Sequence, residues 1–181
     1  MVRYYEIYLR SLGLDRERDG DFFREIADLY DRDEVQGLSV YRQHGDINRL
    51  RHILSVTYMS WRVAKAVGAD EKQTARGAVL HDLFYYDWHD KSWSHRPHAY
   101  RHPGFALDNA KKLTDLTPVE ADIIKKHMWP VTPMLPRYRE SWIVSMADKY
   151  CATQECLAEW FPKYNARIMR DRAKAVAAAG V

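Results

Sequence analysis

Apolar residues recur every three or four positions along most of this chain, and no stretch keeps the period-two alternation of a half-buried strand between turn signals. The clearest helical segment covers residues 50–67 and ends at Gly68, a residue suited to the left-handed position that closes a helix. Further helices are expected at residues 22–38 and 139–160. The second of them is expected to bury a stripe that includes Trp142, Ile143, Met146, Tyr150 and Leu157. The sequence therefore predicts an all-α fold.

Two helix starts are marked by capping residues. Asp70 precedes a periodic segment, and Gln73 stands where the second residue of a capping box is found. Thr117 supplies an N-cap hydroxyl, Pro118 fills the first helical position, and Glu120 is an acid three residues after the cap. These signals predict a helix that leads into His81 and Asp82, called the HD doublet below. They also predict a second helix that runs to about residue 128.

The length of 181 residues fits one domain that buries enough apolar surface to be stable without disulfides. We expect a core at residues 50–156, N-terminal helices within residues 1–49 and a peripheral tail helix at residues 164–181. No run approaches the roughly 20 apolar residues that span a bilayer, and the start has no pattern of a secretory signal. A cytoplasmic protein without membrane contact is therefore expected.

The charge of the chain limits its partners. A net charge of +3 is too weak for a nucleic-acid-binding protein, but it is compatible with an anionic small molecule such as a phosphate compound. The sequence leaves open whether the chain forms a homodimer.

Several ionisable residues fall on the apolar faces of the predicted helices. His52 has apolar neighbours, and His127 follows two isoleucines by one turn. A lone histidine on such a face is more often a hydrogen-bonded core residue than a metal ligand. Asp148 also faces inward, and an unpaired buried carboxylate costs several kcal/mol. Because Lys149 and Arg139 are expected elsewhere around that helix, Asp148 indicates a bound metal or a distant arginine.

The HD doublet itself occupies an unusual position. Asp82 lies near a helix end, where the helix dipole disfavours a carboxylate by about 0.3–1 kcal/mol. One turn before His81, Gly77 costs about 1 kcal/mol relative to alanine, which indicates close approach of a neighbouring helix. Adjacent helical residues project about 100° apart, so His81 and Asp82 could bind one metal only if ligands from other helices surround this helix end.

Histidine and aspartate together suit a pair of first-row transition metals, because imidazole favours such ions and a carboxylate can bridge two of them. Iron is the metal that we expect, with manganese, nickel and zinc as alternatives. The candidate ligands are His52, His81, Asp82, His102, His127 and Asp148.

The order of these residues resembles the HD superfamily of metal-dependent phosphohydrolases over about residues 50–156. Its pattern of a helical histidine, an HD doublet and a later aspartate is matched by His52 in RHILSV, His81 and Asp82 in AVLHDLF, and Asp148 in SMADKY. The resemblance implies that these four residues hold one metal ion.

Two-metal members of the superfamily have two further histidines between the doublet and the last aspartate. His102 in RHPGFAL and His127 in IIKKHMW stand at these places, in an order and spacing similar to the bacterial HD hydrolases of dinucleoside polyphosphates. The resemblance implies a second metal ion on Asp82, His102 and His127, with Asp82 as the bridge.

The resemblance implies a phosphohydrolase that cleaves an ester or anhydride, of a nucleotide, with a metal-activated water, and with Asp82 and His81 as catalytic residues. A di-iron oxygenase is the first alternative, since the superfamily includes such enzymes with a similar ligand set. The second is a regulatory binding module with a structural metal, although a degenerate module would be expected to lack some of the six ligands.

The segment 84–101 is rich in aromatic residues and histidines and must pass near the site. It is either a loop held by its aromatic side chains or a wall that stacks a nucleobase while cations meet phosphate. His98 is the alternative to His102 as a ligand, and His102 is preferred because a helix is expected to start there. The candidate substrate-binding residues are Arg96, His98, Arg101, Lys126 and Lys149.

Overall fold

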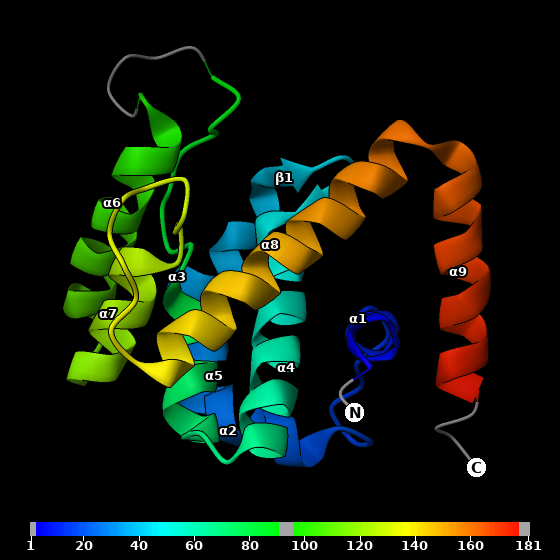
Figure 1. Cartoon of the computed structure of the whole chain (residues 1–181), viewed down its shortest axis with the longest axis horizontal. Coiled ribbons are helices and arrows are strands. Elements are labelled where there is room, and N and C mark those ends of the chain that lie inside the picture. Colours follow the sequence, from blue (N-terminus) through cyan, green and yellow to red (C-terminus); the bar gives the residue numbers. More distant parts are fainter. Residues whose placement is uncertain (1–2, 91–95, 178–181) are drawn as a thin grey trace.

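The computed structural model describes residues 3–90 and 96–177, which form a helical bundle with one small hairpin (Figure 1). The predicted all-α fold is confirmed. None of the described helices has the length and apolar character needed to cross a membrane. The helices are α1 (Tyr4–Ser11), α2 (Gly20–Tyr30), α3 (Asp33–Gln36), α4 (Arg49–Val67), α5 (Glu71–Leu80), α6 (His98–Leu113), α7 (Pro118–Lys126), α8 (Arg139–Trp160) and α9 (Pro162–Ala177).

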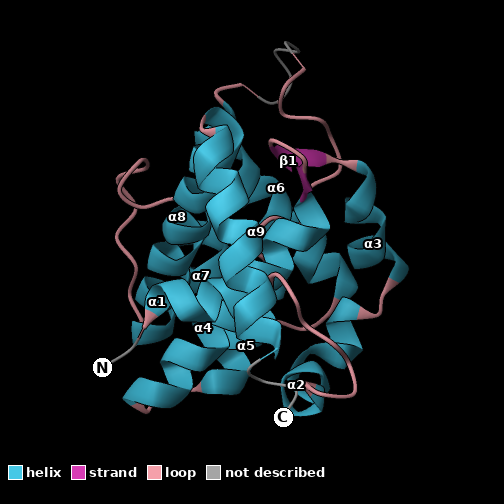
Figure 2. Ribbon diagram, turned by 90° about the vertical axis from the view of Figure 1, so that its right-hand side faces the viewer, coloured by secondary structure: helices cyan, strands magenta, loops and turns pink. Residues whose placement is uncertain are grey.

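Helix α4 lies at the centre of the bundle and contacts α1, α5 and α8 (Figure 1). It begins after Asn48, whose side chain accepts a hydrogen bond from the Arg51 N–H, and it ends at Gly68 in the left-handed conformation with φ 66°. The predicted helix at 50–67 is therefore confirmed. Helix α9 packs against α1 and α8 at the periphery, as expected for the tail (Figures 1 and 2).

The caps of α5 and α7 differ in one respect. At α7 the capping box is complete, because the Glu120 N–H donates to Thr117 Oγ1 at 3.1 Å and the Thr117 N–H donates to Glu120 Oε2 at 2.9 Å. At α5 the Asp70 side chain accepts from the Gln73 N–H, but the Asp70 N–H donates to Glu140 Oε1 at 3.1 Å. Asp70 is thus a cap whose own N–H does not donate to Gln73; instead Gln73 Nε2 donates to Asp70 Oδ2 at 2.7 Å.

The prediction of a single helix over residues 22–38 is wrong. Helix α2 ends at Tyr30, and Arg32 is extended with φ −71° and ψ 140° before the short α3. A 3₁₀ turn, Gly37–Val40, follows. Apolar periodicity continues across this break because Val35 and Leu38 are buried in the same core as α2.

A two-stranded antiparallel hairpin, β1 (Arg42–His44) and β2 (Ile47–Asn48), was not predicted. Its strands of three and two residues are too short to show alternation. Gly45 turns the chain with φ 55°, where glycine is favoured. The hairpin places β1 beside α8, with which it makes contact.

The bounds of α8 agree with the predicted helix at 139–160, but its buried face differs. Met146, expected in the core, is 55% exposed, whereas Asp148 and Glu155 are buried. The expected stripe also included Trp142, Ile143, Tyr150 and Leu157, which are only partly buried. Polar residues lie inward on α8 because this helix crosses the cluster of ionisable side chains described below.

Helices α5 and α7 pack closely at Gly77. A Cβ atom there would lie 2.6 Å from Ile123 Cδ1 and 3.0 Å from Ile123 Cβ, so the predicted close approach is confirmed. The C-terminal ends of these two helices lie close together. His81 is the C-cap of α5 and His127 is the C-cap of α7, and their ring centroids are 5.0 Å apart.

Candidate metal centre

The structure brings all six predicted ligands into one buried cluster. They come from α4, the end of α5, α6, the end of α7, and α8. Every one of them is at most 8% exposed. The cluster consists of His52, His81, Asp82, His102, His127 and Asp148.

The cluster divides into two groups of three, each with donor atoms within 4.8 Å of one another. The first group is His52, His81 and Asp148, and the second is Asp82, His102 and His127. Each group could hold a metal ion. The HD doublet joins them, because His81 belongs to the first group and Asp82 to the second, with 3.7 Å between His81 Nε2 and Asp82 Oδ2.

In the first group, Asp148 lies between two imidazoles. Its Oδ1 atom is 3.2 Å from His52 Nε2 and 3.9 Å from His81 Nε2. Its other oxygen, Oδ2, is 3.2 Å from Lys149 Nζ. The prediction that Lys149 points elsewhere was therefore wrong: although the two residues are adjacent on α8, the long lysine side chain folds back to the carboxylate.

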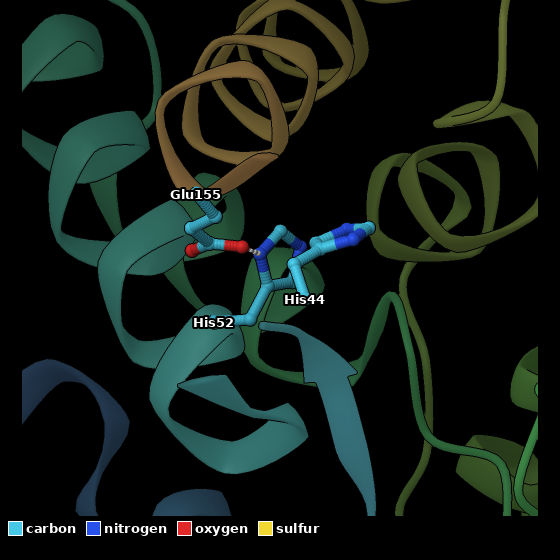
Figure 3. A group of neighbouring side chains, drawn as sticks. All are labelled: His44, His52 and Glu155. Carbon is cyan, nitrogen blue, oxygen red and sulfur yellow. Dashed lines mark hydrogen bonds and ion pairs between the residues drawn. The ribbon is translucent and has the colours of Figure 1, made fainter. Parts of the chain in front are cut away.

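Glu155 is a residue of the site that the sequence interpretation missed (Figure 3). Its side chain is fully buried, and its Oε2 accepts a hydrogen bond of 2.8 Å from His52 Nδ1. A carboxylate on the far nitrogen of a metal-binding histidine fixes the tautomer and the ring orientation. The signal for it was available, because Glu155 follows Asp148 by seven residues, or two turns, on the same face of α8.

His44, His52 and Glu155 form a third group whose donor atoms lie within 4.8 Å (Figure 3). A neutral imidazole has one proton and one lone pair. Since His52 Nδ1 faces the Glu155 carboxylate, the lone pair of neutral His52 is at Nε2, toward Asp148. We therefore assign His52 to the first group and treat Glu155 as its hydrogen-bond acceptor.

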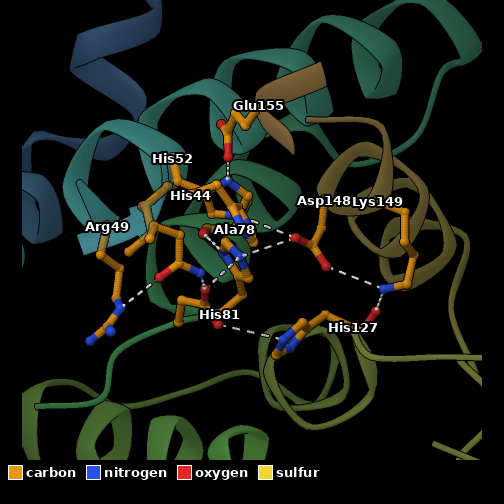
Figure 4. Close-up of polar contacts among 12 residues, drawn as sticks. His44, Arg49, His52, Ala78, His81, His127, Asp148, Lys149 and Glu155 are labelled. Carbon is orange, nitrogen blue, oxygen red and sulfur yellow. Dashed lines mark hydrogen bonds and ion pairs between the residues drawn. The ribbon is translucent and has the colours of Figure 1, made fainter. Parts of the chain in front are cut away.

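In the second group, Asp82 faces two histidines from different helices. Figure 4 shows one of them, His127, beside Lys149. Asp82 Oδ1 is 3.2 Å from His102 Nε2 and 3.6 Å from His127 Nε2. The two Nε2 atoms are only 2.8 Å apart. Three potential metal-ligand atoms thus lie close together where α5, α6 and α7 meet.

Three of the histidines are held in the same tautomer. The Nδ1 atoms of His81, His102 and His127 lie 2.7, 3.0 and 2.9 Å from backbone carbonyl oxygens three or four residues earlier. A carbonyl oxygen only accepts, so Nδ1 carries the proton and the Nε2 lone pair points into the cluster. This is the arrangement in which a histidine binds a metal through Nε2.

The residues fit metal ions because several of their donor atoms have no other partner. Two Nε2 lone pairs 2.8 Å apart, those of His102 and His127, repel each other unless a cation, whether a proton or a metal ion, lies between them. His81 Nε2 and Asp82 Oδ1 are buried and have no hydrogen-bond partner among the described residues. Buried polar atoms without a hydrogen-bond partner are uncommon in proteins, and coordination of a metal ion would satisfy these two atoms.

The electrostatics of the cluster favour the ligand forms of His127 and Asp148, whereas His52 is held protonated. Burial and the neighbouring histidines hold the pKa of His127 well below its ordinary value, so this imidazole is neutral. Burial opposes ionisation of Asp148, but the hydrogen bond from His52 and the charge of Lys149 hold the pKa of Asp148 below its ordinary value. Burial also disfavours a charged His52, yet the carboxylates of Glu155 and Asp148 raise its pKa well above the ordinary value, so an entering metal ion would displace a proton.

A pocket of about 200 Å³ opens onto the cluster. Of the predicted substrate-binding residues, His98 and Lys149 line it. Lys149 also donates a hydrogen bond to the backbone oxygen of His127, so that its ammonium group is held between the two groups of ligands. The rest of the wall is largely apolar or aromatic and includes Trp88, Met128, Val131 and Ala152.

The structure places the other three substrate-binding candidates away from this pocket. Lys126 pairs with Asp122 one turn earlier on α7, at 2.5 Å. Arg101 is exposed and lies over the ring of Phe105, 5.4 Å from its centroid. Arg96 is exposed as well. Residues 91–95 of the aromatic segment lie outside the described residues.

His102, and not His98, belongs to the ligand cluster, although the reason given for preferring it was wrong. Helix α6 begins at His98, so His102 lies in its second turn. The His98 ring stacks on the His102 ring with centroids 4.4 Å apart and an interplanar angle of 19°. His98 therefore covers the ligand on the pocket side.

Comparison of the chain with protein-family models, with curated proteins and with solved structures gives no match. The similarity to the HD superfamily therefore stays a prediction that rests on six residues and their order.

Proposed function

We propose that the protein is a metal-dependent hydrolase of phosphate esters or anhydrides, of the HD type, and that its substrate is a nucleotide. The observation that carries the proposal is the pair of buried three-ligand groups, joined at His81 and Asp82, at the bottom of a pocket that also presents Lys149. A structural metal site normally closes its coordination with four protein ligands around one ion. Two groups of three leave positions for water and substrate.

In this proposal His52, His81 and Asp148 hold one ion, His102 and His127 hold the other, and Asp82 bridges them. Iron is the proposed metal, with manganese, nickel and zinc as alternatives, because imidazole and carboxylate ligands suit all four. Two such ions would lower the pKa of a water molecule and offset the charge on the phosphoryl oxygens.

The chain itself would bind and orient the phosphate. Lys149 Nζ lines the pocket between Asp148 and the backbone of His127, where its charge would attract a phosphoryl oxygen. The pocket volume of about 200 Å³ is below the roughly 300–1,000 Å³ of sites that enclose a whole drug-sized ligand. The pocket would therefore enclose the reacting phosphate, and the rest of a nucleotide would extend to its rim.

Trp88 and His98 line the pocket with their rings stacked on each other, at a centroid distance of 5.4 Å and an interplanar angle of 15°. The stack continues from Trp88 to His89 and from His98 to His102. Aromatic faces stack nucleobases without strong sequence preference, at about 1–3 kcal/mol per base. Because Trp88 and His98 each stack between two neighbouring rings, the proposal of a nucleotide rests on the resemblance to the HD superfamily and not on an aromatic face in this pocket.

The proposal is tested by a substrate screen. Protein loaded in turn with iron, manganese, nickel and zinc would be assayed for phosphate release from mononucleotides, cyclic nucleotides and dinucleoside polyphosphates. We expect turnover of at least one class and its loss in Asp148→Asn. If the metal-loaded protein hydrolyses none of these compounds, the proposed hydrolase activity is contradicted. Oxygen uptake by the reduced iron protein with small polyols or phosphonates would favour the oxygenase, and metal binding without either activity would favour a regulatory module.

The number of ions is tested by a pair of histidine variants. We expect wild-type protein to bind about two equivalents and His102→Ala to bind one, because the second group loses a ligand while the first is untouched. His98→Ala is the matched control, since His98 stacks on His102 but lies outside both groups. Elemental analysis of the purified proteins gives the stoichiometry. Two equivalents in His102→Ala and one in His98→Ala would reverse the ligand assignment.

A further inference from the structure

Arg49 is a fully buried cation in the first turn of α4 whose donors all go to neutral acceptors. Its Nε donates to Gln43 Oε1 at 3.0 Å, and its terminal nitrogens donate to the backbone oxygens of Phe84 at 2.7 Å and Tyr86 at 3.1 Å. Its guanidinium carbon also lies 3.6 Å from the centroid of the Phe84 ring. Burial lowers the pKa of Arg49 to about 10. Burial of a charge costs free energy, which hydrogen bonds and opposite charges must offset.

Gln43 connects this cation to the metal centre. Because arginine only donates, Gln43 Oε1 must face Arg49, and the amide NH₂ of Gln43 must face the other way. There it donates to Asp82 Oδ2 at 2.9 Å. Arg49 therefore determines the orientation of the Gln43 amide, and this orientation directs the amide NH₂ to Asp82.

The hydrogen bond from the Gln43 amide reaches only the Oδ2 atom of Asp82. With Oδ2 bound by the amide of Gln43, the carboxylate cannot rotate freely, and Oδ1 stays directed at His102 and His127. Asp82 follows the end of α5, where the backbone no longer restricts the side chain as a helix would. The carboxylate thus needs an external partner to keep its orientation.

We infer that Gln43 and Arg49 are positioning residues of the metal centre, which orient the Asp82 carboxylate for the ion held with His102 and His127. This inference rests on the proposed metal centre but not on the substrate or on the reaction. Arg49 also anchors residues 84–86 through its terminal nitrogens, which by itself would be a purely structural role. The Nε bond to Gln43 adds nothing to that anchor, so a change at Gln43 separates the two roles.

The test is Gln43→Met, which keeps the length of the side chain and removes the amide. We expect the affinity for the second ion to fall by about 10–100-fold, the loss that removal of such outer partners brings. The affinity for the first ion should fall less, because that ion keeps His52, His81 and Asp148. Titration with manganese or iron against a chelator measures both affinities in the absence of substrate. The matched control is Gln154→Met, because Gln154 is buried to a similar extent but accepts its hydrogen bond from Tyr164.

Wild-type affinity for both ions in Gln43→Met would overturn the inference. If Gln43→Met does not fold, as judged by circular dichroism, Gln43→Asn replaces it, because its shorter amide cannot reach both Arg49 and Asp82. Wild-type affinity in Gln43→Asn would overturn the inference equally. If the wild-type protein binds metal but hydrolyses nothing, the proposed reaction is contradicted and the positioning role of Gln43 and Arg49 is not. If the wild-type protein binds no metal, both proposals are contradicted.

Discussion

Asp82→Ala is expected to lose both metal ions and all measurable hydrolysis. Asp82 Oδ1 lies in the second group, and its Oδ2 lies 3.7 Å from a ligand of the first, so one substitution affects both. The loss of activity should exceed the roughly 10–100-fold that follows when only an outer partner of a ligand is removed. Elemental analysis and the phosphate-release assay, run on the same preparation, measure the two effects.

Asp122→Ala provides the control for this prediction. Asp122 is another buried aspartate, 9% exposed, but it binds Ser141, Lys126 and the Arg137 N–H. Its replacement should leave both ions and the activity in place even where it lowers the melting temperature. Circular dichroism should show Asp82→Ala to be folded, because the apolar core does not depend on the cluster. Outright unfolding of Asp82→Ala would instead make the metal principally structural.

Gly77→Val is expected to lower the free energy of unfolding by about 3 kcal/mol, the upper part of the range for overpacked cores. The Cβ position already lies 2.6–3.0 Å from three atoms of Ile123, and valine adds two methyl groups to this contact. For a chain of this size the change corresponds to a fall in melting temperature of about 2–4 °C per kcal/mol. Urea denaturation followed by circular dichroism measures the free energy directly.

Two glycine-to-alanine variants test whether the close approach of Ile123 to Gly77 is the cause of this destabilisation. Both Gly77 and Gly104 lie inside helices, where alanine is favoured over glycine by about 1 kcal/mol. At Gly104 the nearest atom to a new Cβ is Lys125 Nζ at 3.6 Å, an ordinary contact. Gly104→Ala should therefore stabilise the protein, and Gly77→Ala should not. Equal stabilisation by both would show that α5 and α7 can separate without cost.

The parts of the fold that could be predicted are those determined by local chemistry. Residues 50–67 show helical periodicity, and Thr117 with Glu120 shows a complete cap; both were found where expected. The hairpin escaped prediction because its strands are too short for a period, and the break at Arg32 escaped because apolar residues continue on both sides of it.

The six candidate ligands could be predicted to lie together because their order along the chain carries information that no single residue does. The residues that support them were not predicted. Apolar periodicity placed Met146 inside and ignored Glu155, because it assumes that a helix buries its apolar face. Arg49 was overlooked for the same reason, since a charged residue is expected at the surface. Burial of these two side chains depends on tertiary contacts with His52 and Gln43.

The ends of α5 and α7 meet at the cluster, since His81 and His127 are their C-caps. Each helix C-terminus carries roughly half a negative charge, which adds to the carboxylates of Asp82 and Asp148. These negative charges attract cations and oppose the entry of a phosphate anion. In the proposed reaction the metal ions would therefore bind before the anionic substrate.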